Sequence, residues 1–142
     1  MNFEASRSKA IEKLNNFIEK NLSEYSKLRN FDFGPKNRSN ISCLSPYVTH
    51  GIINENELIK KSLSKFPFSK IEKFIQEVLW RTYWKGWLEL RPNVWKDYLI
   101  EFNKIKEEFK NNQKYLNAIN GKTNIECFNA WVNELRENNY LH

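Results

Sequence analysis

The sequence predicts an all-α fold, and two observations carry this prediction. Only 4 glycines and 4 prolines interrupt the 142 residues, and no run of alternating β-branched residues is long enough to argue for a sheet. Hydrophobic residues recur instead at the three- and four-residue spacing of helices. Because 40% of the residues are hydrophobic and 15% aromatic, a real core is available, and we expect a single domain over residues 1–142.

The N-terminal segment predicts an amphipathic helix that begins near Ser6, a favourable N-cap, with Leu14 and Phe17 on its inner face. The pattern continues or restarts as far as Leu28. A polar loop follows over residues 30–40, and a loop of this length in a compact domain is often functional.

Two short helices are expected next. The first begins near Pro46, with Ser45 as its N-cap, and ends at Gly51; in the second, Asn54 caps a helix that runs to about Leu63.

A long aromatic helix then opens at a capping box made by Ser69 and Glu72 and stops before Pro92. Further helices are predicted over about residues 93–109 and 125–136.

The aromatic helix carries Trp80, Tyr83 and Trp84 on one face and further apolar residues opposite, so we expect it to be central and buried. Glu77 and Arg81 lie one turn apart in its narrow charged strip. A carboxylate and a guanidinium beside tryptophan rings suit a flat, electron-rich or anionic ligand. The simpler interpretation, that each aromatic residue is only core, stays open.

A second candidate site lies where the short helix near Pro46 begins. Free backbone N–H groups and the positive end of the helix dipole are expected there, beside the hydroxyls of Ser42 and Ser45. This is a favourable phosphate site, and Arg29 stands close in sequence to add charge. The alternative is that Ser45 merely caps a helix.

Composition narrows the function classes. Lysine and arginine exceed the acids by 23 to 17, which gives +6 and favours a polyanionic partner, although a solvated lysine-rich surface explains the excess equally well. Cys43 and Cys127 form neither a disulfide framework nor a zinc pattern, and His50 has no ligand partners, so we expect no metal site. We find no nucleotide-binding glycine loop or hydrolase motif, signal peptide or membrane span, and we expect a soluble, cytoplasmic protein.

Taken together, these segments resemble the FAD-binding helical domain of the photolyase/cryptochrome family. Residues 25–29 and 42–51 resemble its tyrosine, arginine and TSxLSPYL-x-x-G segment. Residues 77–84 resemble its ELxWREFY helix, and residues 121–142 its GKTGYPxVDAAMRxLxxxGWMH segment. The three matches occur in the family's order and cover most of the chain.

The resemblance implies FAD as cofactor and DNA as partner. The implied FAD-binding residues are Tyr25, Arg29, Ser42, Leu44, Ser45 and Arg81. The implied residues for damaged DNA are Glu77, Trp80, Arg81 and Trp84, with Trp80 stacking on a flipped pyrimidine dimer. No catalytic side chain is implied, because excited reduced flavin performs the family's dimer-splitting electron transfer, a carbon-carbon lyase reaction.

Departures from the family pattern indicate a divergent branch. Ile41 stands where a hydroxyl residue is usual, Thr82 replaces the second glutamate of the WRE triplet, and Asn129 stands at the aspartate of VDAAM. The resemblance also implies that the chain stops at His142 before the flavin-ring half, and that no antenna-binding α/β domain precedes it. We therefore expect a partial FAD-binding module for light-driven repair or blue-light sensing, inactive unless a second chain supplies the missing half.

Two other readings stay open. One is a non-catalytic basic helical module that binds nucleic acid through lysines and stacking aromatics. The other is a remnant without activity, marked by large exposed aromatic faces.

Overall fold

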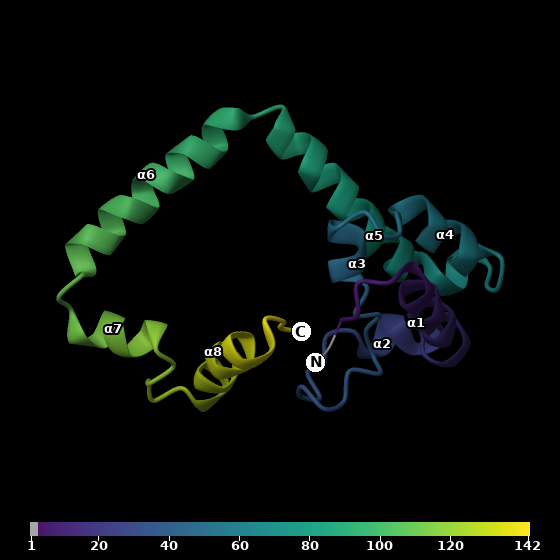
Figure 1. The fold of residues 1–142 in the computed structure, drawn as a ribbon, viewed down its shortest axis with the longest axis horizontal. Helices are drawn as coiled ribbons and strands as arrows, with labels where there is room; N and C mark the ends of the chain where they lie inside the picture. Colours follow the sequence, from purple (N-terminus) through teal and green to yellow (C-terminus); the bar gives the residue numbers. More distant parts are fainter. Residues whose placement is uncertain (1–2) are drawn as a thin grey trace. The chain divides into compact units, whose positions relative to one another are not determined.

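The computed structural model describes residues 3–142, and its regular structure over that range is entirely helical, which confirms the all-α prediction (Figure 1). The described chain divides into two compact units, residues 3–85 together with 142, and residues 86–141. The elements in order are α1 (Arg7–Lys20), the 3-10 turn η1 (Leu22–Glu24), α2 (Tyr25–Leu28), α3 (Ser45–Thr49), α4 (Glu55–Leu63), α5 (Phe68–Glu89), α6 (Pro92–Phe109), α7 (Gln113–Ile119) and α8 (Glu126–Asn138).

Local capping explains where the first helices begin. Ser6 Oγ accepts a hydrogen bond from the Lys9 N–H at 3.4 Å, which confirms Ser6 as the N-cap of α1. At α4 the capping box is complete: Asn54 Oδ1 accepts from the Glu57 N–H, and Glu57 Oε2 accepts from the Asn54 N–H, both at 3.0 Å.

Two predicted caps are wrong. Ser45 is the first residue of α3 and Leu44 is its N-cap, so the Ser45 side chain makes no capping bond. Ser69 lies inside α5, which begins at Phe68, because the Lys70 N–H already bonds the Pro67 carbonyl at 3.0 Å. The predicted capping box therefore does not form there.

Helix α7 is short and is not predicted by the sequence pattern. Its N-terminus is capped by Asn112, whose Oδ1 accepts from the Tyr115 N–H at 3.1 Å.

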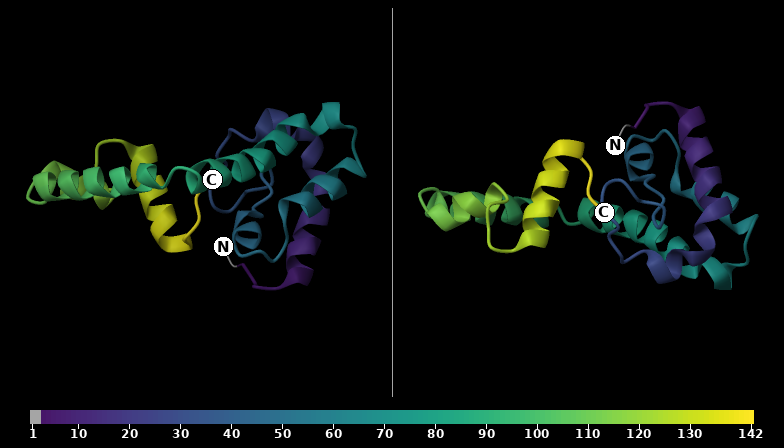
Figure 2. Two further views of the ribbon diagram at one scale, coloured as in Figure 1. Left: turned by 90° about the horizontal axis from the view of Figure 1, so that it is seen from above. Right: turned by 90° about the horizontal axis from the view of Figure 1, so that it is seen from below.

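The hydrophobic core lies within residues 3–85, where Figures 1 and 2 show α1, α3, α4 and the first part of α5 gathered together. Leu14 of α1 is fully buried, and Phe17 lies with its ring centroid 5.3 Å from that of Phe74 on α5. Each such side chain contributes about 1.5–3 kcal/mol on burial. The core consists of Ala10, Leu14, Phe17, Ile18, Leu22, Leu44, Tyr47, Ile53, Leu58, Ile71, Phe74, Ile75 and Val78.

The aromatic helix is only partly buried, so the prediction of a wholly central helix is wrong. Ile71, Phe74, Ile75 and Val78 on its first turns are buried. Further along, Trp80, Tyr83 and Trp84 expose 50%, 53% and 51% of their surface. The helix packs into the core with the face that carries Phe74 and Val78, and the face that carries Trp80 and Tyr83 is accessible.

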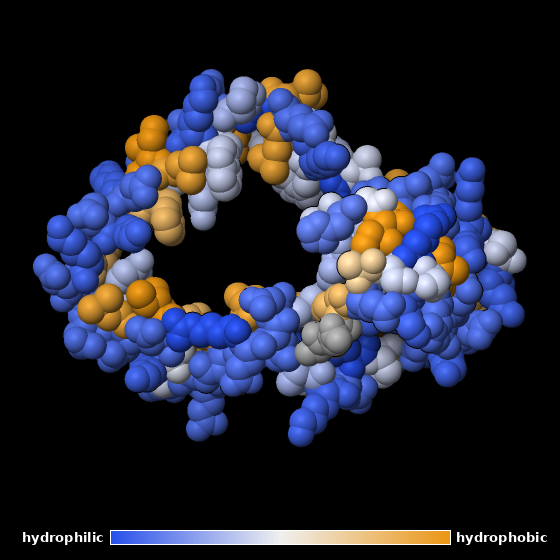
Figure 3. Space-filling model, in the orientation of Figure 1, coloured by the Kyte–Doolittle hydropathy of each residue, from blue (hydrophilic) through white to orange (hydrophobic). Residues whose placement is uncertain are grey.

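Residues 86–141 contribute no side chain to this core. The thirteen core side chains all come from residues 3–85, and α6 has no buried residue. Figure 3 shows hydrophobic side chains on the surface along α6.

A tight turn joins α7 and α8, where Gly121 has φ +63 and a Cβ added there would lie 3.1 Å from Val132. Among residues 3–142, no helix combines the length and apolar character that crossing a bilayer requires.

Candidate functional site

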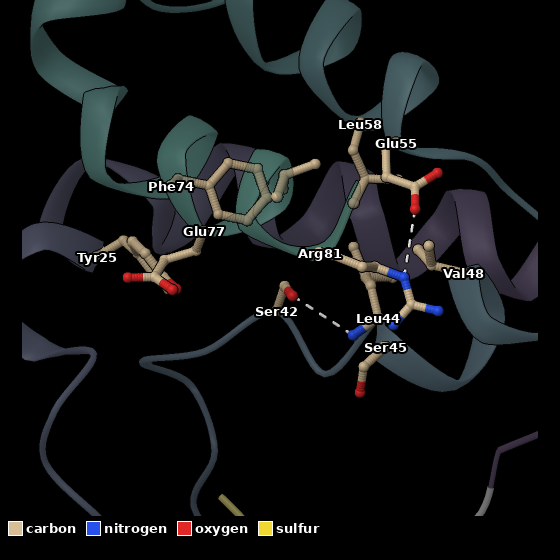
Figure 4. Close-up of a pocket in the computed structure, with 11 residues that line it drawn as sticks. Tyr25, Ser42, Leu44, Ser45, Val48, Glu55, Leu58, Phe74, Glu77 and Arg81 are labelled. Carbon is tan, nitrogen blue, oxygen red and sulfur yellow. Dashed lines mark hydrogen bonds and ion pairs between the residues drawn. The ribbon is translucent and has the colours of Figure 1, made fainter. Parts of the chain in front are cut away.

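A cavity of about 150 Å³ opens within the first unit, between α5 and the segments that carry α2, α3 and α4 (Figure 4). Six of the predicted site residues line it, drawn from three parts of the chain that are distant in sequence. These six are Tyr25, Ser42, Leu44, Ser45, Glu77 and Arg81. The remaining lining residues are Val48, Glu55, Leu58, Phe74 and Val78.

The apolar part of the lining is an extension of the core. Leu44, Leu58, Phe74 and Val78 are buried, so their positions are set by packing rather than by any ligand. A pocket with a rigid apolar wall and a few polar groups is the usual form of a small-molecule site.

The segment before α3 turns sharply into the cavity. Cys43 has φ 51, a left-handed conformation that is uncommon for residues other than glycine. Ser42 Oγ lies 3.4 Å from the Leu44 N–H, which donates to it. The first hydrogen bond of α3 runs from the Val48 N–H to the Leu44 carbonyl at 3.1 Å, so the N–H groups before it precede the helical ladder. Two hydroxyls and a helix start therefore share one side of the cavity.

Arg81 connects α5 to α3 and α4 at the edge of the cavity. Its Nε lies 3.3 Å from Glu55 Oε1, an ion pair visible in Figure 4, and its Nη2 donates to Thr49 Oγ1 at 3.1 Å. These partners hold the guanidinium in one orientation. Glu55 and Thr49 were not predicted as site residues, because nothing in their own sequence neighbourhood indicates a contact with a residue on α5.

Tyr25 lies against Phe17 and Phe74, with ring centroids 5.9 Å and 5.3 Å away, both edge-on. Burial raises the pKa of Tyr25 to about 12, and the carboxylate of Glu77 adds to the rise, whereas Arg29 opposes it. The phenol is therefore neutral at physiological pH and is able to donate a hydrogen bond.

Arg29 lies beside the cavity rather than in its lining. Its Nε is 3.9 Å from Glu77 Oε1, and its Nη1 donates to the Ser26 carbonyl at 2.7 Å. The arginine thus partly balances the one carboxylate that α5 brings to the site.

Trp80 and Trp84 lie outside the cavity. Trp80 lines a separate, open groove with Gln76, Leu79 and Tyr83. The rings of Trp80 and Trp84 are stacked at 6.2 Å with 24° between their planes, and Tyr83 lies edge-on to both. Trp80 and Trp84, both predicted to contact DNA, thus lie apart from the predicted cofactor residues that line the cavity.

The donor set fits part of a dinucleotide. Two serine hydroxyls, a phenol and an arginine suit a phosphate or ribityl group. The volume is below the 300–1,000 Å³ typical of ligand pockets, so the cavity is large enough for only part of a dinucleotide. Next to Ile41, the Nδ2 of Asn40 donates to the carbonyls of Leu28 and Phe31 at 2.8 Å and 2.6 Å.

The other chemistry-bearing side chains form no second centre. Both cysteines are free thiols, with Cys43 buried and Cys127 exposed. Over residues 3–142, no group of three or more His, Cys, Asp or Glu side chains is arranged to hold a metal ion.

Comparison with known proteins gives two curated relatives of the same kind, whereas no family model and no solved structure matches the chain. A deoxyribodipyrimidine photo-lyase of Vibrio cholerae serotype O1 is 21% identical over 134 residues, which cover 91% of this chain and 28% of that protein. A deoxyribodipyrimidine photo-lyase of Buchnera aphidicola subsp. Baizongia pistaciae is 27% identical over 131 residues, 89% of this chain and 27% of that protein. The chain thus spans just over a quarter of the length of these relatives. With its all-α fold and similarity along about nine-tenths of its length, the chain is a partial, distant match to the photolyase family.

Proposed function

We propose that this chain is a photolyase-type helical module whose cavity between α3, α4 and α5 binds part of FAD and whose adjacent α5 surface binds damaged DNA. One observation carries the proposal: six residues with roles implied by the resemblance, distant in sequence, line a single cavity. Both relatives are named for a lyase activity on deoxyribodipyrimidine, and we propose that this module serves the same kind of repair or a related light response.

The residues of this chain would bind and orient the cofactor. Ser42 and Ser45 would donate to phosphate oxygens at the start of α3, and the neutral phenol of Tyr25 would donate from the opposite side. Arg81, held by Glu55, would present its charge at the cavity edge. When bound, reduced flavin supplies the light-driven electron transfer.

A further polypeptide is proposed to complete the flavin pocket. The cavity, at about 150 Å³, leaves most of a dinucleotide outside it, and buried ligand surface is what retains a cofactor. We therefore expect the isolated chain to lose FAD readily and to retain it, with repair activity, when the remaining part of a photolyase fold is supplied.

Flavin binding tests the first half of the proposal. FAD is titrated into the purified chain and its fluorescence quenching recorded for the wild type, S42A/S45A and S26A. Removing two hydroxyl donors should weaken binding roughly 10- to 30-fold, at about 1 kcal/mol each. The exposed serine of α2 is the matched control, and S26A should bind as the wild type does. Equal affinities for all three proteins would refute the assigned phosphate side, and stoichiometric FAD on the isolated chain would refute an incomplete pocket.

DNA binding tests the second half. Oligonucleotides with and without a thymine dimer are compared for the wild type, Trp80→Ala and Trp95→Ala. Stacking on a base contributes about 1–3 kcal/mol, so Trp80→Ala should lose most of any preference for the damaged strand. Trp95, 59% exposed on α6, controls for the loss of an accessible tryptophan.

A basic nucleic-acid-binding module without flavin remains the second candidate, and the distribution of charge favours it. Residues 1–85 contain 15 lysines and arginines against 9 acids, whereas residues 86–142 contain 8 of each, so the whole +6 lies in the first part. Salt-sensitive DNA affinity that is independent of FAD and of the dimer would select this function.

A further inference from the structure

Five lysines cluster around the connection between α4 and α5. Lys60 and Lys61 belong to the second half of α4, Lys65 to the connection, and Lys70 and Lys73 to the first turns of α5. Glu72 is the one acid among residues 60–73. Within residues 3–142, none of the five ammonium groups has a carboxylate within 4.0 Å, in contrast to Lys9, Lys27, Lys104 and Lys110.

Lys73 lies beside the aromatic groove on α5, and Lys70 lies one turn before it. Lys73, Gln76, Trp80 and Tyr83 follow one another at spacings of three or four residues, which places them in one row on a helix. Lys73 Nζ donates to Gln76 Oε1 at 2.9 Å, and Gln76 itself lines the groove with Trp80 and Tyr83. Basic and aromatic groups therefore form a continuous row, which we call the α5 stripe: Lys70, Lys73, Gln76, Trp80, Tyr83 and Trp84.

The acids beside the stripe are already engaged. Glu72 Oε1 accepts from Gln76 Nε2 at 2.8 Å, and Glu77 lies 3.9 Å from Arg29. The stripe is on the accessible side of the helix, because the buried residues of α5 occupy the opposite face. From Lys70 to Trp84 the helix rises about 21 Å, and from Lys73 to Trp80 about 10 Å.

We propose that the α5 stripe binds single-stranded nucleic acid, with Lys70 and Lys73 on the phosphates and Trp80 and Tyr83 on the bases. The inference extends the proposed DNA-binding function by adding a backbone contact outside the cavity. Aromatic side chains stack on bases that are unpaired, so the groove selects a single strand or a locally opened duplex. At one phosphate per 3.4 Å of strand in a duplex, the lysines lie about three phosphates away from the base on Trp80.

Charge complementarity favours nucleic acid as the occupant. The net charge of residues 1–85 is +6, whereas that of residues 86–142 is zero, so the potential around the stripe is positive. An anionic lipid surface would also attract the lysines, and Phe68 and Leu63, 53% and 42% exposed, lie near them. The rings of Trp80 and Tyr83 in the groove offer stacking surfaces for bases, which favours nucleic acid as the occupant.

The test measures binding of a fluorescein-labelled, undamaged thymidylate strand of about 16 nucleotides by anisotropy, between about 50 and 200 mM NaCl. The proteins are the wild type, K70Q/K73Q, the control K96Q/K114Q, and Trp80→Ala. The control removes the same charge from exposed lysines of α6 and α7. K70Q/K73Q should bind about 10-fold more weakly at low salt, with the slope of log K against log salt reduced by about 1.4, two contacts at about 0.7 each.

The outcomes separate this inference from the proposed function. Equal losses of strand affinity in K70Q/K73Q and K96Q/K114Q, or no loss in either, would overturn the stripe as a specific contact. A loss of affinity confined to Trp80→Ala would also overturn the stripe, while leaving the base pocket in place. A loss in K70Q/K73Q with normal Trp80→Ala would support the lysine contact and contradict the stacking role. Lysine-dependent binding to phosphatidylserine vesicles without binding to the strand would overturn the choice of nucleic acid. Circular dichroism checks that each variant is folded.

Discussion

The half-buried phenol of Tyr25 predicts a specific loss of stability in alkali. Burial and the nearby Glu77 carboxylate raise the pKa of Tyr25 to about 12 in the folded protein, whereas an unfolded tyrosine titrates near 10. The folded state therefore favours the protonated phenol. The resulting stability is fully present below about pH 10 and is lost as the pH rises from 10 towards 12.

The size of the effect follows from the two pKa values. At about pH 11 the unfolded tyrosine is one unit above its pKa and the folded one is a unit below, so ionisation favours unfolding by about 1.4 kcal/mol. Because Tyr25 is only half-buried, solvent screening reduces this to about 1 kcal/mol. The other titrating groups are common to wild type and Y25F, so the difference between the two proteins isolates this one.

The assay is urea unfolding of wild type, Y25F and Y98F, followed by circular dichroism at about pH 9 and pH 11. Y25F should gain about 1 kcal/mol relative to wild type between the two pH values, whereas Y98F, with its half-exposed ring on α6, should not. Glu77→Gln should reduce the wild-type loss, since Glu77 contributes to the shift. The reasoning is refuted if Y25F and wild type lose the same stability, because Tyr25 would then not be buried against Phe74 and Glu77.

Three further predictions concern the fold. Leu14→Ala should lower the free energy of unfolding by about 3–5 kcal/mol in a urea titration, because Leu14 is fully buried. In the same titration Leu90→Ala should change the free energy of unfolding by less than about 0.5 kcal/mol, because Leu90 is 81% exposed. Asn54→Ala should cost about 1 kcal/mol through loss of the capping box at α4, measured in the same way. Limited proteolysis with mass spectrometry should cut residues 86–141 well before residues 3–85, since the buried core lies in the latter; equal cutting rates would contradict this.

Sequence reasoning predicted most helices because their signals are local. A cap such as Asn54 and a hydrophobic period such as that of Leu14 and Phe17 depend on neighbours within one or two turns. The predicted helix starts at Ser45 and Ser69 were wrong because the signal there is ambiguous. A serine near the start of a helix is able to cap the helix or to lie within its first turn.

The motif residues of the candidate site were predictable from the sequence, but the residues that hold them in place were not. Glu55 and Thr49 hold Arg81 from other helices, and such contacts depend on how α3, α4 and α5 pack. The prediction that the aromatic face of α5 is buried failed for a related reason. Tryptophans at helical spacing have the same pattern whether they face a protein core, a cofactor or a nucleic acid, and the pattern alone does not identify the partner.

The three faces of α5 explain how one helix serves several contacts. Its buried apolar face, with Phe74 and Val78, is fixed in the core, which makes the helix a rigid support. Arg81 on the second face borders the cavity, and Lys73 and Trp80 on the third form the stripe. Because the faces diverge from one rigid axis, a substitution on one should leave the geometry of the others intact. Flavin binding and strand binding are therefore separable by mutation even though both depend on the same helix.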